Sequence, residues 1–404
     1  MVTVHKVAFA VLGILVIGIF SLVMVDGAFL PKKYLEPWSG TYHTQFEDPR
    51  VQVLAHGVLA PNSHNLQSWK VVLEGDNSFL LYVDPGRLSP KADPPGRQVT
   101  ISQGTFLEYV GVAAGNLGYE AEMQLFPEGE YGPEGTATNL GSKPVARVIL
   151  KETTRETEPE SSTLYKSMFV PDTYRVPYRE AQLSKEDIET LEALSTENVT
   201  ILIFQDPESL ESLGNIVLRA AEVETGNDGI QQEGFELFRP NEWKKNEYRY
   251  GFSLDGQELP AFNIHLMQGL ISLFPFLNSP EVSGQSFLSQ TESAVENTPA
   301  YALIITKGNS RTAQVEAGIL YSRFLLAATD MGYAMQPMSQ ALEEYPEMAE
   351  IYMEIHEAYT GENETIQMLI RVGVPEKEVS PTMRLDVMDI IEVSKATENS
   401  YIRL

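Results

Sequence analysis

Cysteine is absent from this chain, so thiol chemistry is excluded. No disulfide framework, iron–sulfur cluster, Cys-ligated zinc or thiol nucleophile can form without it. Basic residues are also scarce: 29 Lys and Arg stand against 56 Asp and Glu, which gives a formal net charge of −27 over 404 residues. Because nucleic-acid phosphates are bound by clustered Lys and Arg, this charge argues against a nucleic-acid partner.

Several signatures of catalysis and cofactor binding are also missing. The histidines show no metal-ligand spacing, so we predict no metal site; they are His5, His43, His56, His64, His265 and His356. No Gly-x-Gly-x-x-Gly fingerprint of a dinucleotide site is present. Ser63 and His64 are adjacent, but neighbouring side chains rarely point together and no Gly-x-Ser-x-Gly elbow accompanies them, so a hydrolase is not indicated.

Apolar residues are plentiful, and the chain opens with a long run of them. Residues 7–25 contain no charge and would span about 28 Å as a helix, close to the hydrocarbon thickness of a bilayer. We predict a single-pass membrane anchor within residues 1–27, with the short tail inside and the body outside the cytoplasm. A cleaved signal peptide is the alternative. Lys6 on one side and Lys32 and Lys33 on the other leave the orientation open.

The remaining chain alternates strand-like and helix-like segments, which predicts an α+β fold. We expect a linker at 28–45, a first half at 46–163 and a second half at 164–404. Runs that favour strands are 69–73, 79–83, 145–150 and 199–204, and segments with helical periodicity are 98–117, 183–194 and 210–223. A polar and aromatic segment, 225–262, is long enough to be a lid or an excursion from the fold.

An internal repeat is the most informative feature of this pattern. Five residues recur at an offset of 214: Gly104, Ala113, Ala114, Gly118 and Tyr119 return as Gly318, Ala327, Ala328, Gly332 and Tyr333. Coincidence among common residues is the alternative. Small residues at fixed helical positions allow close approach, so the repeat predicts two equivalent helices that meet at a pseudo-twofold axis. The chain would then be a monomeric pseudo-dimer with its ligand site between the halves.

The densest polar motif is Ala-Pro-Asn-Ser-His-Asn-Leu-Gln-Ser-Trp at residues 60–69. It offers several side-chain donors and acceptors from one short segment, and such a set suits the edge of a flat heteroaromatic ring. An ordinary Asx-rich turn or helix cap would show the same residue types.

This motif resembles the Ala-Pro-Ser-x-x-Asn-x-Gln-Pro-Trp signature of the FMN-dependent nitroreductase family, and the duplicated chain looks most like its Acg-type branch. Similar matches follow in order over about residues 45–392. They are Asp-Pro-Pro-Gly-Arg at 93–97, Ile-Ser-Gln-Gly at 101–104, Gly-Tyr-Ala-Met-Gln-Pro-Met-Ser-Gln at 332–340, Ile-Gln-Met-Leu-Ile-Arg-Val-Gly at 366–373 and Pro-Thr-Met-Arg at 381–384.

The resemblance implies one retained FMN site. By residue, it implies that the isoalloxazine is edged by Pro61, Asn62, Ser63 and Asn65, that the phosphate and ribityl chain are clamped by Thr173, Arg175 and Arg384, and that Ser339 and Gln340 donate backbone N–H groups to the ring. The chain departs from the family pattern at Pro171, where the first clamp arginine usually stands, and at Ser68 and Thr382. The phosphate grip is therefore expected to be thinner than in a typical member.

The implied activity is hydride transfer from NAD(P)H through FMN to a small electron-poor acceptor, with no catalytic side chain of the protein's own. The alternative is a non-catalytic protein that binds or sequesters FMN at the membrane, where reduced nicotinamide is scarce if the body is extracytoplasmic.

Overall fold

The computed structural model describes residues 2–132, 139–153, 159–255 and 259–392. Its helices are α1 Val2–Asp26, α2 Pro49–Gly57, α3 Arg97–Asn116, α4 Pro159–Ser167, α5 Lys185–Glu192, α6 Pro207–Thr225, α7 Asp228–Leu237, α8 Glu242–Tyr248, α9 Ala261–Leu273, α10 Pro280–Glu296, α11 Arg311–Asp330, α12 Ala349–Tyr359 and α13 Val387–Ile390. The strands are β1 Trp69–Glu74, β2 Ser78–Val83, β3 Tyr119–Leu125, β4 Ala146–Glu152, β5 Val199–Phe204, β6 Ala300–Lys307, β7 Ala334–Pro337 and β8 Glu364–Gly373. Short 3₁₀ helices are η1 Lys33–Trp38, η2 Tyr42–Gln45, η3 Ser63–Asn65, η4 Pro275–Asn278, η5 Ser339–Leu342 and η6 Pro346–Met348.

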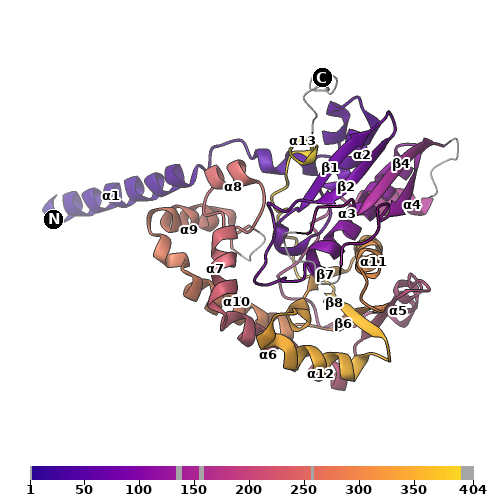
Figure 1. Cartoon of the computed structure of the whole chain (residues 1–404). Coiled ribbons are helices and arrows are strands. Elements are labelled where there is room, and N and C mark those ends of the chain that lie inside the picture. The colour runs from indigo at the N-terminus through magenta and orange to yellow at the C-terminus, as the bar shows by residue number, and fades with distance from the viewer. Residues whose placement is uncertain (1, 133–138, 154–158, 256–258, 393–404) are drawn as a thin grey trace.

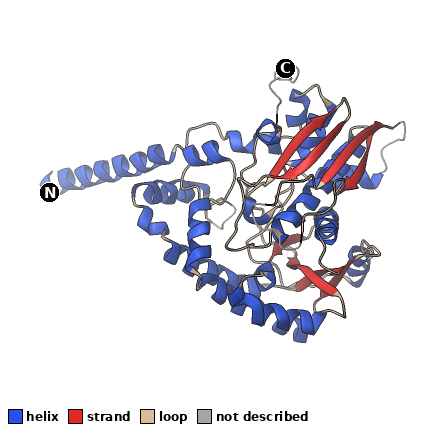
Figure 2. Ribbon diagram, viewed as in Figure 1, coloured by secondary structure: helices blue, strands red, loops and turns tan. Residues whose placement is uncertain are grey.

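The strands form two antiparallel four-stranded sheets, which confirms the α+β prediction (Figure 2). The strand orders are β1-β2-β4-β3 and β5-β6-β8-β7, so the sheets share one topology. In each, one long helix connects the second strand to the edge strand that follows: α3 in the first sheet and α11 in the second. The strands of the second sheet's centre, β6 and β8, are buried along nearly their whole length, which explains their continuous apolar runs.

The two long helices pack directly against each other, as the repeat predicts. A Cβ added to Gly104 would overlap the carbonyl oxygen of Val315, and one added to Gly318 would overlap that of Ile101. Ile101 and Val315 are themselves separated by the repeat offset. Each also lies in a hydrophobic core made mainly by the other half. The contact is therefore reciprocal, and only glycine allows the two backbones to come so close.

The segment expected to be a linker, 28–45, is packed onto the body. Tyr34 and Tyr42 are buried, and the Tyr42 hydroxyl accepts a hydrogen bond from the backbone N–H of Val387. The N–H of Arg384 likewise donates to the carbonyl of Tyr34. Two segments more than 300 residues apart in the sequence thus stabilise each other.

The end of the described chain returns to the first sheet. Val387 and Ile390 lie in the core of the first half, and Ile391 forms a parallel bridge with Val71. This segment belongs by sequence to the predicted second half, 164–404, of which residues 393–404 lie outside the described part. A side chain from the second half can therefore reach the motif at residues 60–69.

Between β5 and β6 the chain makes a helical excursion through α6, α7, α8, α9 and α10. The segment 225–262, predicted to be irregular, contains α7 and α8, because Asn227 and Asn241 each cap a short helix. Figure 1 shows α1 projecting from the body and α9 beside its body-side end.

Candidate functional site

The polar motif at residues 60–69 folds into a tight loop that ends at β1. His64, Asn65 and Gln67 all have positive φ, at 55°, 49° and 51°. This conformation costs each non-glycine residue roughly 1–2 kcal/mol and persists only where surrounding contacts impose it. Backbone strain of this kind concentrates at functional sites.

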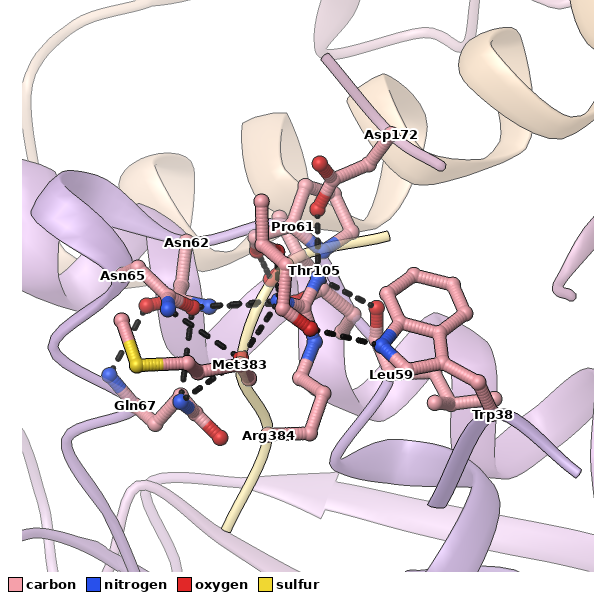
Figure 3. Close-up of polar contacts among 12 residues, drawn as sticks. Trp38, Leu59, Pro61, Asn62, Asn65, Gln67, Thr105, Asp172, Met383 and Arg384 are labelled. Atoms are coloured by element: carbon pink, nitrogen blue, oxygen red, sulfur yellow. Dashed lines mark hydrogen bonds and ion pairs between the residues drawn. The ribbon is translucent and has the colours of Figure 1, made fainter. Parts of the chain in front are cut away.

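The contacts that impose the conformation come from side-chain amides (Figure 3). Asn65 Nδ2 donates to the carbonyls of Gly251 and Met383, each at 3.1 Å. Gln67 Nε2 donates to the carbonyl of Arg249 at 2.9 Å, and its Oε1 accepts from the backbone N–H of Leu385. The amides therefore tie the loop to the C-terminal segment and to residues 249–251, which follow α8 within the helical excursion.

Ser63 connects the loop to the second half of the chain. Its hydroxyl donates to Gln98 Oε1 at 2.8 Å, and Gln98 Nε2 donates to Glu343 Oε1 at 3.2 Å. Glu343 directly follows η5, which carries the predicted residues Ser339 and Gln340. The structure thus links the first-half residues of the predicted site to those of the second half through one glutamine.

Arg175 lies close enough to His64 of the polar motif for its charge to act on that imidazole. Surrounding protein lowers the pKa of Arg175 by desolvation, yet its side chain is solvent-exposed. From these two observations we infer a concave surface around Arg175 that water still reaches, and we call this surface the cleft. Within the described residues, Arg175 makes no side-chain hydrogen bond or ion pair. Desolvation, with a smaller contribution from the charge of Arg175, lowers the pKa of His64 to about 4, so that imidazole is neutral at pH 7.

Arg384, the second predicted clamp arginine, is almost fully occupied by protein contacts. Its side chain is 1% exposed, and it forms a 2.7 Å ion pair with Asp172. It also donates to Asn65 Oδ1, to Thr382 Oγ1 and to the carbonyls of Leu59 and Met383. Only its Nε lacks a partner among the described residues. Arg384 therefore joins the loop, the C-terminal segment and Asp172 (Figure 3).

The other predicted site residues differ in how many of their polar groups are already bonded within the protein. The Asn62 amide is used locally, since it donates to the carbonyl of Ala60. Pro61 is buried, and its carbonyl accepts from Thr105 Oγ1. Ser339 Oγ is hydrogen-bonded to the backbone of Leu369, whereas Oε1 of Gln340 is buried without a partner. Thr173 is half-buried, and its side chain makes no hydrogen bond to another residue in the described ranges.

These donors are consistent with a phosphate monoester at the Arg175 end of the cleft. Arg175 supplies an unpaired positive charge. The hydroxyl of Tyr321 is buried without a partner, and desolvation and the charge of Asp172 raise its pKa, so it remains a hydrogen-bond donor. With Nε of Arg384, three donors of the kind that phosphate oxygens accept lie around Asp172.

Glu343 forms a buried carboxyl pair with Glu224 beside the cleft. Desolvation and then the charge of Glu224 raise the pKa of Glu343, and desolvation raises that of Glu224 to about 7. A carboxyl group whose pKa is higher in the folded state stabilises the fold below its unfolded pKa, and this stabilisation is lost as the pH rises through the folded value.

We therefore expect Glu343→Gln to make the unfolding free energy less dependent on pH. Between pH 5 and pH 8 the parent chain should lose stability, and the variant should be the more stable of the two at pH 8 by about 1–3 kcal/mol, the cost of an unsatisfied buried polar group. Urea unfolding of both proteins at the two pH values measures this. Glu350→Gln, an exposed substitution on α12, is the control. Parallel pH profiles for parent and variant would contradict the buried pair.

Three residues of the site were not singled out by the sequence. Asp172 was visible only as a neighbour of Arg175, Gln98 lies at an unremarkable helix position, and Tyr321 is one of 18 tyrosines. Among these three residues, Tyr321 was the one near a sequence signal, because it lies on α11, the helix that the internal repeat identified.

Comparisons with known proteins point in one direction. The model of the nitroreductase family matches residues 175–374. A Mycobacterium tuberculosis (strain H37Rv) protein, "Putative NAD(P)H nitroreductase Rv3131", is 26% identical over 365 residues, 87% of this chain and 93% of that protein. The uncharacterized protein Rv3127 of the same strain is 22% identical over 84% of this chain and 91% of its own length. Among solved structures, an FMN-bound nitroreductase from Desulfitobacterium hafniense covers 57% of this chain and 98% of its own, at 13% identity and a TM-score of 0.36.

Proposed function

Because the chain belongs to the nitroreductase family, we propose that it is an FMN-dependent oxidoreductase that uses NAD(P)H to reduce a small electron-poor acceptor. FMN, when bound, supplies the redox chemistry, so the protein needs no acid–base side chain of its own. The observation that carries the proposal is the guanidinium of Arg175, which is exposed, makes no side-chain bond to a described residue and lies near His64 of the first half.

Each side of the cleft would have a distinct task. Arg175 and the hydroxyl of Tyr321 would bind the phosphate, whose charge near −2 needs a local cation in so acidic a protein. The strained loop of Pro61, Asn62, Ser63 and Asn65 would border the ring, and Ser339 and Gln340 would approach it from the opposite half. Thr173 lies two residues before Arg175 and would contact the ribityl chain.

We assign Arg384 chiefly a positioning role. Four of its five N–H groups are directed to protein acceptors, and Asp172 neutralises its charge. It can offer a ligand only Nε. Its main effect would be to hold the loop and Asp172 in place, so Arg175 is left as the principal charge for the phosphate.

A non-catalytic FMN-binding or sequestering protein is the second candidate. It is favoured by the same pairing of Arg384 with Asp172, and by the residues 249–251, which close over the loop through the bonds to Asn65 and Gln67. Such a cover would restrict access of a nicotinamide to the cleft.

A visible spectrum of the full-length chain in detergent separates the two candidates. We expect a flavin absorbance that bleaches when NADH or NADPH is added without oxygen. A flavin spectrum that does not bleach, although dithionite bleaches it, would remove the enzyme and keep the binder. A colourless protein that takes up no added FMN would exclude both.

We also propose that α1 is an uncleaved, single-pass anchor and that the body is extracytoplasmic. By length and composition, His5–Asp26 is suited to span a membrane, and its exposed surface is apolar. The alternative, a cleaved signal peptide, would remove contacts of the folded body. Asp26 is fully buried and its Oδ2 lies 2.6 Å from His265 Nδ1, while Gly27 lies against the indole ring of Trp243.

A further inference from the structure

A group of large apolar side chains is exposed on α9 and η4, beside the anchor helix. Phe274 is 47% exposed and Phe276 is 69% exposed. We call this surface the apolar wedge; it consists of Phe262, Met267, Leu273, Phe274, Phe276 and Leu277. Exposed apolar residues are ordinary when scattered, but six of them within residues 262–277 indicate a surface that water does not cover.

The wedge extends in the direction of the membrane. His265 contacts Asp26, and four residues later Gly269 lies against the carbonyl of Leu22, so α9 runs antiparallel to α1 (Figure 1). Leu273, eight residues beyond His265, therefore lies about 12 Å further along α1 towards its N-terminus, at 1.5 Å per residue. Half of a bilayer's hydrocarbon core is about 15 Å thick. The tip at η4 would reach deep into one leaflet.

The local sequence and charge suit this position. Residues 259–280 contain no Asp, Glu, Lys or Arg, although 21% of the chain is charged. At the base of the wedge, Lys32, Lys33 and Lys244 are exposed where lipid headgroups would be; Lys32 lies 3.9 Å from Glu242, and Lys244 pairs with Glu247 at 2.7 Å. In a chain of net charge −27, lysines at this point would face anionic headgroups favourably. Trp243, 55% exposed beside Gly27, lies where interfacial tryptophans are usually found.

We propose that the apolar wedge inserts into the same leaflet that α1 enters, and that α9 and η4 form a re-entrant hairpin which holds the body against the membrane. The inference rests on the anchor proposed above. Insertion of the wedge would also affect the position of the site. The wedge follows residues 249–251 in the helical excursion, and these residues accept hydrogen bonds from the strained loop. The cleft would therefore be held close to the bilayer surface.

The absence of cysteine allows a direct test on the full-length chain. Single-cysteine variants Phe276→Cys, Ile14→Cys and Met353→Cys would each be labelled with a small fluorophore. The labelled proteins would be reconstituted, one chain per disc, in nanodiscs of phosphatidylcholine and phosphatidylglycerol with nitroxide groups on the acyl chains. Ile14 on α1 reports the anchor. Met353, an apolar residue 56% exposed on α12, is the matched control.

We expect the lipid nitroxide to remove most of the fluorescence at positions 14 and 276 and to leave that at 353 almost unchanged. Strong quenching at 14 with no more quenching at 276 than at 353 would overturn the wedge and leave the anchor intact. No quenching at 14 would overturn the anchor, and the wedge with it. A parallel sample in discs that hold two chains tests a second copy as the occupant. If the probe at position 276 were there shielded from aqueous iodide but not quenched by the lipid nitroxide, a second copy would cover this surface, and the wedge would be overturned.

Discussion

Replacing Arg175 with alanine should lower the affinity for FMN roughly 10- to 100-fold, the value of one or two charge-assisted hydrogen bonds. We expect so large an effect because the side chain of Arg175 makes no bond to described protein groups and its charge is not offset by an ion pair, so its donors are free for the phosphate. Arg384, by contrast, is neutralised by Asp172. Isothermal titration of the flavin-free chain with FMN, or the fluorescence quenching of free FMN, measures the change.

Arg179→Ala provides the matched control, since Arg179 is an exposed arginine four residues along the same segment. Its removal should leave the affinity within about twofold, as expected for a surface charge. Riboflavin, which lacks the phosphate, should bind the parent and Arg175→Ala equally. If Arg175→Ala retained the parent affinity for FMN, the assignment of the phosphate end of the cleft would be wrong.

Replacing Gly104 with valine should destabilise the fold by about 4 kcal/mol or more, or prevent folding. A loss of this size is among the largest that single substitutions cause. The first atom of any side chain at this position would overlap the carbonyl of Val315 on the facing helix. Because backbone atoms cannot rotate away, the two helices would have to separate, and with them the two halves that bound the cleft. Gly318→Val should be equally damaging, because its Cβ would meet the carbonyl of Ile101.

Gly115→Ala on the same helix tests the specificity of this effect. No atom lies within 4 Å of a Cβ at Gly115, so the substitution should change stability by less than about 1 kcal/mol, in the stabilising direction. Urea unfolding in detergent, followed by circular dichroism, compares the three variants with the parent. Equal effects of Gly104→Val and Gly115→Ala would contradict the close helix contact.

Local elements could be predicted well because their signals are contained within short windows. The helix expected over 98–117 is α3, Arg97–Asn116, and the strand expected over 199–204 is β5. Ser184 caps α5 through the N–H of Asp187, as its spacing indicates. The segment 28–45, predicted to be a linker, shows where such short windows are insufficient, because the structure packs its tyrosines onto the body. The partners of its buried tyrosines lie near residue 385, which no local pattern can reveal.

The candidate site was likewise predictable only in part from the sequence. The sequence singled out Arg175 and Arg384 as two similar clamp residues. Their surroundings differ, because Asp172 pairs with Arg384 while Arg175 faces the cleft. An arginine's ability to bind a ligand depends on whether its donors are already used, and that depends on groups brought together from distant parts of the chain.

By itself, the sequence excluded thiol chemistry, argued against a nucleic-acid partner, indicated the anchor, located the polar loop and revealed the repeat that brings Gly104 and Gly318 together. Those conclusions follow from composition, spacing and periodicity, which are properties of the chain. Tertiary structure alone decided which donors remain free, how the loop at residues 61–67 is strained into place and where α9 lies relative to α1. These depend on contacts between residues far apart in the sequence, for example Asn65 and Arg384, which are 319 positions apart, and such contacts exist only once the chain has folded.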